Sequence, residues 1–215
     1  MTNDYLIIGA GGLAKEILFL CENIIGDLNK FKGFIDYRPK AKYIKFRGKE
    51  FPVHDEDEFL KDVLNKENKI DLYNGIGDPK TISKVTKKFE NFNFPNLIHN
   101  TFVGDITSIS FGKGNIITAG CVFTVDIKIG SFNLFNLSTT VGHDTVIEDC
   151  NVFNPGCNIS GNVNIRSRNL FGTNSTVLQS VEIGDDNILG AGSLGNKSFS
   201  DGNIMIGIPA KPLKV

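Results

Sequence analysis

The most constraining feature of this sequence is an apolar residue at every sixth position through its second half. The series begins at Phe111 and continues without interruption for fourteen positions to Leu189. Because 40% of the chain is hydrophobic, chance agreement at all of these positions is expected only about once in several hundred thousand sequences. Short repeats of fixed period are typical of solenoids, and six-residue repeats are typical of β-helices.

Three such hexads, 18 residues in all, are needed to close one triangular coil with an apolar side chain on each inner wall. Glycines that follow apolar positions, such as Gly130 and Gly142, are predicted at the bends between walls. Asparagine tolerates left-handed backbone and can hydrogen-bond within its own turn. Five asparagines at 18-residue intervals are therefore predicted to stack down one corner: Asn115, Asn133, Asn151, Asn169 and Asn187.

The first half follows a different pattern, in which short apolar strands alternate with helical segments. Such alternation favours a parallel sheet with helices packed on it. The predicted strands are Tyr5–Gly9, Lys32–Asp36 and Ile70–Ile76, and the predicted helices are Leu13–Ile25, Phe59–Leu64 and Pro79–Lys88. We expect an α/β domain over residues 1–95, a β-helix over 96–200 and a tail over 201–215.

Composition narrows the function classes. A net charge of −1 disfavours a nucleic-acid partner, because duplex binders normally carry a basic excess. The chain has no apolar run long enough to span a membrane and no signal-like start, so a cytoplasmic protein without a membrane partner is expected. Four cysteines without a CxxC pair predict buried thiols rather than a disulfide or a metal site: Cys21, Cys121, Cys150 and Cys157.

Five motifs, in this order, resemble one branch of the hexapeptide-repeat acyltransferases. They are Gly9–Lys15, Gly33–Asp36, Gly75–Asp78, Gly142–Asp144 and Gly207–Lys211. The branch contains sialic-acid O-acetyltransferase-like proteins and the N-acetyltransferases of nucleotide-linked amino sugars. Two positions depart from its pattern, since Leu13 and Val152 stand where histidines are common.

The resemblance implies a fold, a reaction and an assembly. The fold is an N-terminal nucleotide-binding, Rossmann-like α/β domain followed by a left-handed parallel β-helix. The reaction is the acetyl-CoA-dependent N-acetylation of a 4-amino-4,6-dideoxy sugar linked to UDP, dTDP or GDP, for surface polysaccharide or glycan synthesis. The assembly is a homotrimer with its sites in the clefts between subunits.

His143 is the candidate catalytic residue. An imidazole can accept a proton at neutral pH, as acyl transfer to an amine requires, and Asp144 could orient the ring. Strict alternation would place His143 on the same side as the inward Val141, whereas a bend after Gly142 would place it outside. A surface histidine on a turn is the alternative interpretation.

The other two histidines are assigned no catalytic role. His54 is expected to be solvated in an acidic loop, and His99 to be structural at the domain junction. Neither has a plausible set of metal-ligand neighbours, so no catalytic metal is expected.

A glycine-rich turn follows the first predicted strand and precedes a helix, where backbone N–H groups can hold a diphosphate. A plain βα turn is one alternative. A dinucleotide site is another, because Asp36 ends the second strand as a ribose-binding acid would. The resemblance instead implies a nucleotide-sugar site. Its residues are Gly9, Gly11, Gly12, Asp36 and Gly77.

Coenzyme A needs few side chains, and the resemblance assigns it mainly to backbone positions. The N–H of Gly161, one coil beyond His143, would polarise the thioester carbonyl. Gly190 and Ala191 would line the lower part of the site. Lys211 and Lys214 would meet its phosphates, although a solvated basic tail is an equal alternative.

Two other functions remain open at this point. Within the enzyme class, a sugar or sialic-acid O-acetyltransferase would use the same residues. From a different class, a non-catalytic nucleotide-binding protein could use the repeat only for assembly. Release of thiol from acetyl-CoA that depends on an amino sugar would separate the enzymes from the binder.

Overall fold

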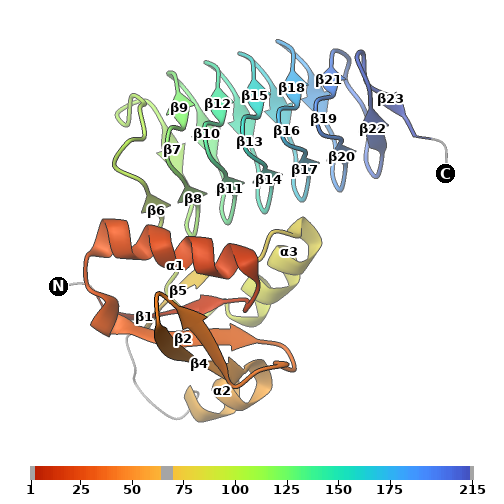
Figure 1. Cartoon of the computed structure of the whole chain (residues 1–215). Helices are drawn as coiled ribbons and strands as arrows, with labels where there is room; N and C mark the ends of the chain where they lie inside the picture. Colours follow the sequence, from red (N-terminus) through yellow and green to blue (C-terminus); the bar gives the residue numbers. More distant parts are fainter. Residues whose placement is uncertain (1–2, 64–69, 214–215) are drawn as a thin grey trace.

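The computed structural model describes residues 3–63 and 70–213. Figure 1 shows an α/β unit formed by the first part of the chain and a solenoid formed by the second. Helix α1 (Gly12–Ile25) lies between the sheet of the α/β unit and the coils. In the described chain, no helix is both long and apolar enough to cross a membrane.

The α/β unit is built on five strands in the order β3-β4-β2-β1-β5. Its strands are β1 (Asp4–Ile8), β2 (Phe31–Asp36), β3 (Tyr43–Phe46), β4 (Lys49–Asp55) and β5 (Ile70–Asn74). Its helices are α1, η1 (Leu28–Lys30), α2 (Glu56–Val63) and α3 (Pro79–Lys88). Every predicted strand and helix of this half is present, although α2 begins earlier than expected and the predicted end at Leu64 lies outside the described residues.

The prediction of a parallel sheet holds for four strands and is wrong for β3. Strand β3 pairs antiparallel with β4, so the sheet is mixed. The two strands join through Arg47 and Gly48, both at positive φ (47° and 78°). Such a turn suits a tight hairpin, and only Gly48 signalled it in the sequence. His54, expected in a loop, lies in β4 with Nε2 3.1 Å from the Lys32 carbonyl oxygen.

Three sheets form the walls of the solenoid, parallel throughout except for the last strand of one of them, and we name them by their outward side chains. The covered face contains β6 (Leu97–Ile98), β8 (Ile116–Ile117), β11 (Leu134–Phe135), β14 (Val152–Phe153), β17 (Leu170–Phe171), β20 (Ile188–Leu189), β22 (Ile204–Ile206) and β23 (Lys211–Pro212). The uncharged face contains β9 (Val122–Phe123), β12 (Thr140–Val141), β15 (Asn158–Ile159), β18 (Thr176–Val177) and β21 (Leu194–Gly195). The charged face contains β7 (Ser110–Phe111), β10 (Lys128–Ile129), β13 (Val146–Ile147), β16 (Asn164–Ile165) and β19 (Glu182–Ile183).

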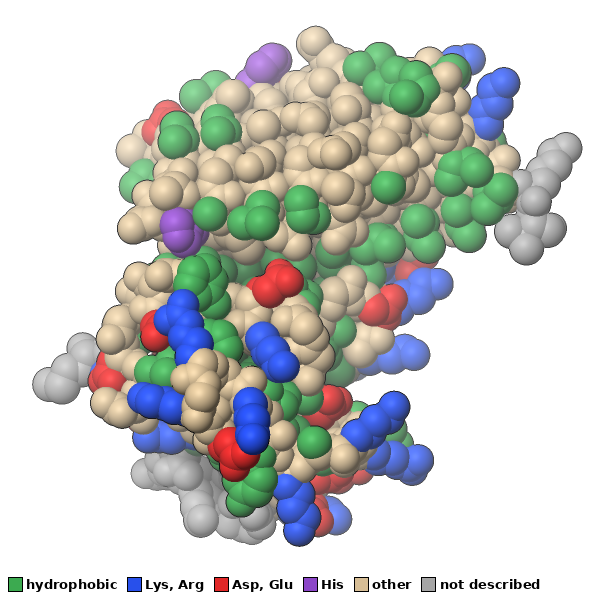
Figure 2. All heavy atoms as spheres, viewed as in Figure 1, with side chains coloured by type: hydrophobic (Ala, Val, Ile, Leu, Met, Phe, Trp, Pro, Cys, Tyr) green, Lys and Arg blue, Asp and Glu red, His purple; other side chains and the backbone are tan. Residues whose placement is uncertain are grey.

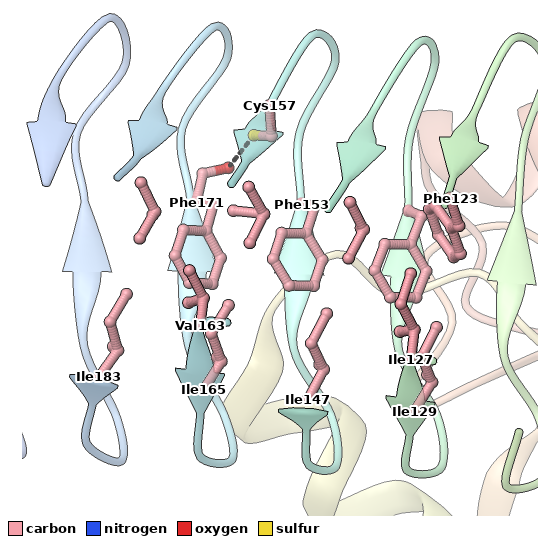
Figure 3. Close-up of a cluster of buried hydrophobic side chains, with 14 of the residues drawn as sticks. Phe123, Ile127, Ile129, Ile147, Phe153, Cys157, Val163, Ile165, Phe171 and Ile183 are labelled. Carbon is pink, nitrogen blue, oxygen red and sulfur yellow. Dashed lines mark hydrogen bonds between the residues drawn. The ribbon is translucent and has the colours of Figure 1, made fainter. Parts of the chain in front are cut away.

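The apolar position of each predicted hexad is the second residue of a strand and points into the solenoid, as predicted. Figure 3 shows the inward side chains stacked from coil to coil. Along the covered face Phe135, Phe153 and Phe171 stack with ring centroids 4.7 and 4.5 Å apart. Burial of each such ring contributes about 1.5–3 kcal/mol.

The asparagine ladder is also confirmed. Each backbone N–H donates to the side-chain oxygen of the preceding asparagine, for example Asn151 to Asn133 at 2.8 Å. The ladder extends beyond the predicted five to Asn96 and Asn203. The left-handed residue is not the asparagine itself but the one before it, such as Cys150 with φ 59°.

Glycine is needed at the corners for a different reason from the one predicted. Gly142 does not adopt a positive φ, but a Cβ there would lie 2.5 Å from the Gly161 nitrogen of the next coil. Glycine is therefore required at this corner by the close approach of successive coils.

The covered face carries the α/β unit because its outward side chains are apolar. Ile116, Leu134 and Val152 are buried in one cluster with Ile17 and Leu20 of α1. This shared core fixes the α/β unit on one wall of the solenoid. Strands β12 and β15 of the uncharged face lie on the side away from it (Figure 1).

Candidate active site

His143 lies on the outer side of a corner between the uncharged and charged faces, as the bend after Gly142 allowed. Strand β12 ends at Val141 and β13 begins at Val146, and the corner between them holds both His143 and Asp144. The two side chains are 52% and 61% exposed. They therefore contribute little to the core and are accessible to a substrate.

The contact between these side chains selects the tautomer of the neutral imidazole. His143 Nδ1 lies 2.7 Å from Asp144 Oδ2. A carboxylate can only accept a hydrogen bond, so in the neutral ring Nδ1 carries the proton and Nε2 has the free lone pair. This arrangement suits a general base oriented by an acid.

Gly161 lies directly beneath the imidazole of His143. A Cβ at this position would be 2.6 Å from Nε2 and 2.7 Å from Cε1, so any other residue would displace the ring. Within the described chain, the Gly161 N–H donates no hydrogen bond to protein, although the residue is buried. A buried, unused donor beneath a base is a suitable partner for a developing negative charge.

A second group of predicted residues gathers at the carboxyl edge of the α/β sheet. Gly9 follows β1, and its N–H donates to the Ile35 carbonyl at 2.7 Å. Its φ is +103°, and a Cβ there would lie 2.9 Å from the Gly75 oxygen. Gly9 therefore shapes the turn. Asp36 ends β2 at the same edge, with Oδ1 accepting the Tyr37 N–H at 2.8 Å.

The N-terminus of α1 opens at this edge. Gly11 is its N-cap residue, and no side chain caps the helix. A Cβ on Gly11 or Gly12 would meet no atom of the described residues within 4 Å. Exposed first-turn N–H groups with free space in front of them can hold an anion. Gly77 is exposed in the loop after β5, next to Leu13.

The structure does not bring these two groups together within one chain. The His143 corner follows β12, on the side of the solenoid away from the α/β unit (Figure 1). The glycine-rich edge belongs to the α/β unit, which is fixed to the covered face. A substrate held at that edge therefore cannot rely on its own subunit's corner.

Comparison with solved structures gives full-length matches. A His-to-Asn mutant of perosamine N-acetyltransferase from Caulobacter crescentus, in complex with CoA and GDP-perosamine, is 26% identical with a TM-score of 0.88, covering 100% of this chain and 99% of that one. The acetyltransferase domain of PglB from Neisseria gonorrhoeae FA1090 is 26% identical with a TM-score of 0.85, covering 98% and 100%. WeeI from Acinetobacter baumannii AYE is 25% identical with a TM-score of 0.85, covering 99% and 100%. No family model and no curated protein sequence matches the chain.

Over its full length the chain has the fold of these acetyltransferases. The matches span both the α/β unit and the solenoid, so the resemblance does not rest on the repeat alone. A second structure of the same PglB domain was solved in complex with acetyl coenzyme A.

The remaining predicted residues lie at the far end of the solenoid. Gly190 follows β20, and a Cβ there would lie 2.9 Å from Ile206 Cγ2. Ala191 is exposed at the same corner. Lys211 is exposed in β23, which pairs antiparallel with β22. Lys214 lies outside the described residues.

The four cysteines are buried and free, as predicted. Burial raises the pKa of Cys121 and of Cys150 to about 11, so both thiols stay protonated at neutral pH. Within the described chain, no group of three or more His, Cys, Asp or Glu side chains is placed to hold a metal ion.

Sequence reasoning missed residues that support the two groups. Asn74, buried at the end of β5, holds the loop after it through both backbone groups of Ile76. The Asn162 N–H donates to the His143 carbonyl at 2.7 Å. Thr145 lies buried behind the same corner. Thr145 could have been found in the sequence, because it is a threonine in a series of otherwise aliphatic residues spaced by 18.

Proposed function

We propose that this chain is an acetyl-CoA-dependent N-acetyltransferase of the cytoplasm. Its substrate would be the amino group of a 4-amino-4,6-dideoxy sugar linked to UDP, dTDP or GDP, for surface polysaccharide or glycan synthesis. The observation that carries the proposal is the full-length similarity to a perosamine N-acetyltransferase in complex with CoA and GDP-perosamine. The His143–Asp144 pair above Gly161 supplies a chemical reason for it.

In this mechanism His143 is the general base. Acetyl-CoA supplies the acetyl group as a thioester. As the amine forms the new C–N bond and the C–S bond breaks, Nε2 takes the amine proton and then passes it to the departing thiolate. The Asp144 carboxylate holds Nδ1–H and stabilises the imidazolium. A positioned base of this kind contributes a factor of about 10²–10⁴.

The Gly161 N–H would donate to the thioester oxygen as negative charge develops there. Its lack of an acceptor among the described residues and its position beneath Nε2 support this role. One such donor contributes a factor of about 10²–10³. Gly190, Ala191 and Lys211 would contact the rest of the coenzyme at the last coils.

The α/β unit would bind the nucleotide in the manner of a Rossmann-like fold. The chain proceeds from β1 to β2 and β4 on one side and to β5 on the other. Ligands of α/β sheets bind where the strand order reverses in this way, at the carboxyl ends of the strands. The diphosphate would lie at Gly11 and Gly12, between Gly9 and Gly77, and Asp36 would contact the ribose or the base.

A homotrimer would complete each site with residues of two subunits. The separation of the His143 corner from the glycine-rich edge supports this assembly. So does the uncharged face, whose outward side chains are Val122, Thr140, Asn158, Thr176 and Leu194. Figure 2 shows charged side chains gathered over the α/β unit, while the visible side of the solenoid carries few. The division at residues 95 and 200 into binding domain, β-helix and tail belongs to this proposal.

The test is an assay of thiol release with acetyl-CoA and a panel of UDP-, dTDP- and GDP-linked 4-amino sugars. We expect release with at least one amino sugar and none with its 4-hydroxy counterpart. The product should resist mild base, as an amide does. A base-labile product would identify an O-acetyltransferase. Nucleotide-sugar binding without any thiol release would indicate a non-catalytic binding protein.

A further inference from the structure

Thr145 is the one polar residue in an otherwise aliphatic column. At 18-residue intervals this column places a buried side chain immediately before each strand of the charged face. Its other members are Ile109, Ile127, Val163 and Val181, all buried in the solenoid core. Thr145 is fully buried as well. It lies two residues after His143, on the coil that carries the candidate base.

The hydroxyl of Thr145 connects the His143 corner to the next coil. Thr145 Oγ1 donates to the Ser160 carbonyl at 3.2 Å and accepts the Val163 N–H at 3.4 Å. It also lies 3.5 Å from the His143 carbonyl oxygen. These groups flank the peptide that joins Ser160 to Gly161.

That peptide unit carries the donor assigned to the thioester. In a trans peptide the C=O and the N–H point in opposite directions. The Ser160 carbonyl is bound by a hydroxyl inside the solenoid, so the Gly161 N–H faces outward. A hydrogen bond to the carbonyl also polarises the N–H of the same peptide.

We propose that Thr145 is a positioning residue that orients and polarises the Ser160–Gly161 peptide for acyl transfer. The inference rests on the proposed function of His143 and Gly161. Thr145 touches no substrate and acts only through the peptide. A purely structural role would explain less, because the same left-handed corner forms three more times with an aliphatic residue in place of Thr145, at Ile127, Val163 and Val181.

The experiment compares three variants. Thr145→Val keeps the shape of the side chain and matches the neighbours in its column, whereas Thr145→Ser restores a hydroxyl. Thr139→Val is the matched control, because Thr139 is equally buried and its hydroxyl donates to the Asn136 carbonyl at 2.7 Å, at a different corner. All three are assayed for kcat and for the KM of both substrates.

We expect kcat to fall about ten-fold in Thr145→Val, since misdirecting a donor costs less than the 10²–10³ for deleting one. Both KM values should stay within about two-fold of wild type. Thr145→Ser should recover most of the loss, and Thr139→Val should keep wild-type kcat. An unchanged kcat in Thr145→Val, or an equal loss in Thr139→Val, would overturn the proposal.

A second measurement does not depend on activity. The amide resonance of Gly161 should move in Thr145→Val, return towards its original position in Thr145→Ser and stay in place in Thr139→Val. If no amino sugar is acetylated, the proposed function fails. The amide resonance of Gly161 then still tests whether Thr145 orients the Ser160–Gly161 peptide. If the enzyme is active but this resonance does not respond, the role of Thr145 is rejected alone.

Discussion

Asp144 occupies a position that the fold itself restricts. It is one of the left-handed residues that recur every six positions, with φ 57°. Asp and Asn tolerate this conformation better than most residues. The corner alone would therefore explain an aspartate, and only its 2.7 Å contact with His143 Nδ1 indicates a second role. A useful substitution must remove the negative charge of Asp144 and still tolerate the left-handed backbone conformation.

Replacing His143 with Ala should lower kcat by about 10²–10⁴, the contribution of a positioned general base. Binding of both substrates should change little, because the ring is half exposed and outside the core. Steady-state kinetics with the amino sugar, together with calorimetric binding constants, measure both effects. Turnover near the wild-type rate would remove His143 from the mechanism.

Asp144→Asn is the paired variant. Its side-chain oxygen can still accept the hydrogen bond from Nδ1, and its backbone tolerates the left-handed corner. The loss of kcat should therefore be smaller than in His143→Ala, because only charge stabilisation is removed. A loss as large as that of His143→Ala would show that the carboxylate charge itself is indispensable.

Helix α1 both packs against the solenoid and presents its N-terminus at the glycine-rich edge. One side buries Ile17 and Leu20 against the covered face, and its N-terminus opens uncapped at the glycine-rich edge. The glycines at that edge differ in what they do. Gly75 packs so closely that a Cβ would lie 2.9 Å from Ala14, while Gly11 has free space in front of it.

Gly11→Val should therefore raise the KM for the nucleotide sugar strongly, since its side chain would fill the space before the helix N-terminus. The protein should fold normally, because nothing lies within 4 Å of the new Cβ. Coenzyme A binding should be unchanged. Thermal unfolding and titrations with each ligand test this.

Gly75→Val supplies the contrast, with a lower melting temperature expected from its clash with Ala14. If Gly11→Val weakened both ligands and stability equally, damage to the βα turn would be the cause.

How well the sequence predicted each part of the fold depended on how regularly that part repeats. The inward position of each hexad was predictable because the same position recurs every six residues on successive walls. The β3–β4 hairpin was not, because only Gly48 marked its turn. His143, Asp144 and Gly161 were proposed from the sequence, but the contact of the ring with Gly161 depends on two coils stacking in register. The oxygen that Thr145 bonds is also on another coil.

The whole molecule has its two candidate half-sites on different sides, and this determines the assembly we expect. Light scattering at assay concentrations should give three times the 23.6 kDa mass of the chain. A charge placed on the uncharged face, such as Thr140→Lys, should weaken association, because desolvating a lysine in an interface is costly. Lys128→Glu, on the charged face, is the control. A fully active monomer would contradict the proposal.

The asparagine ladder also limits how this chain can change in length. Its central rungs are 18 residues apart, and each bonds the next. Inserting or deleting one residue would turn the inward side chains outward. Inserting or deleting six residues would move an asparagine to a different corner of the solenoid. Only a whole coil preserves every column, extending the molecule by one strand spacing of about 4.8 Å. Insertions and deletions within the solenoid are thus confined to multiples of this unit.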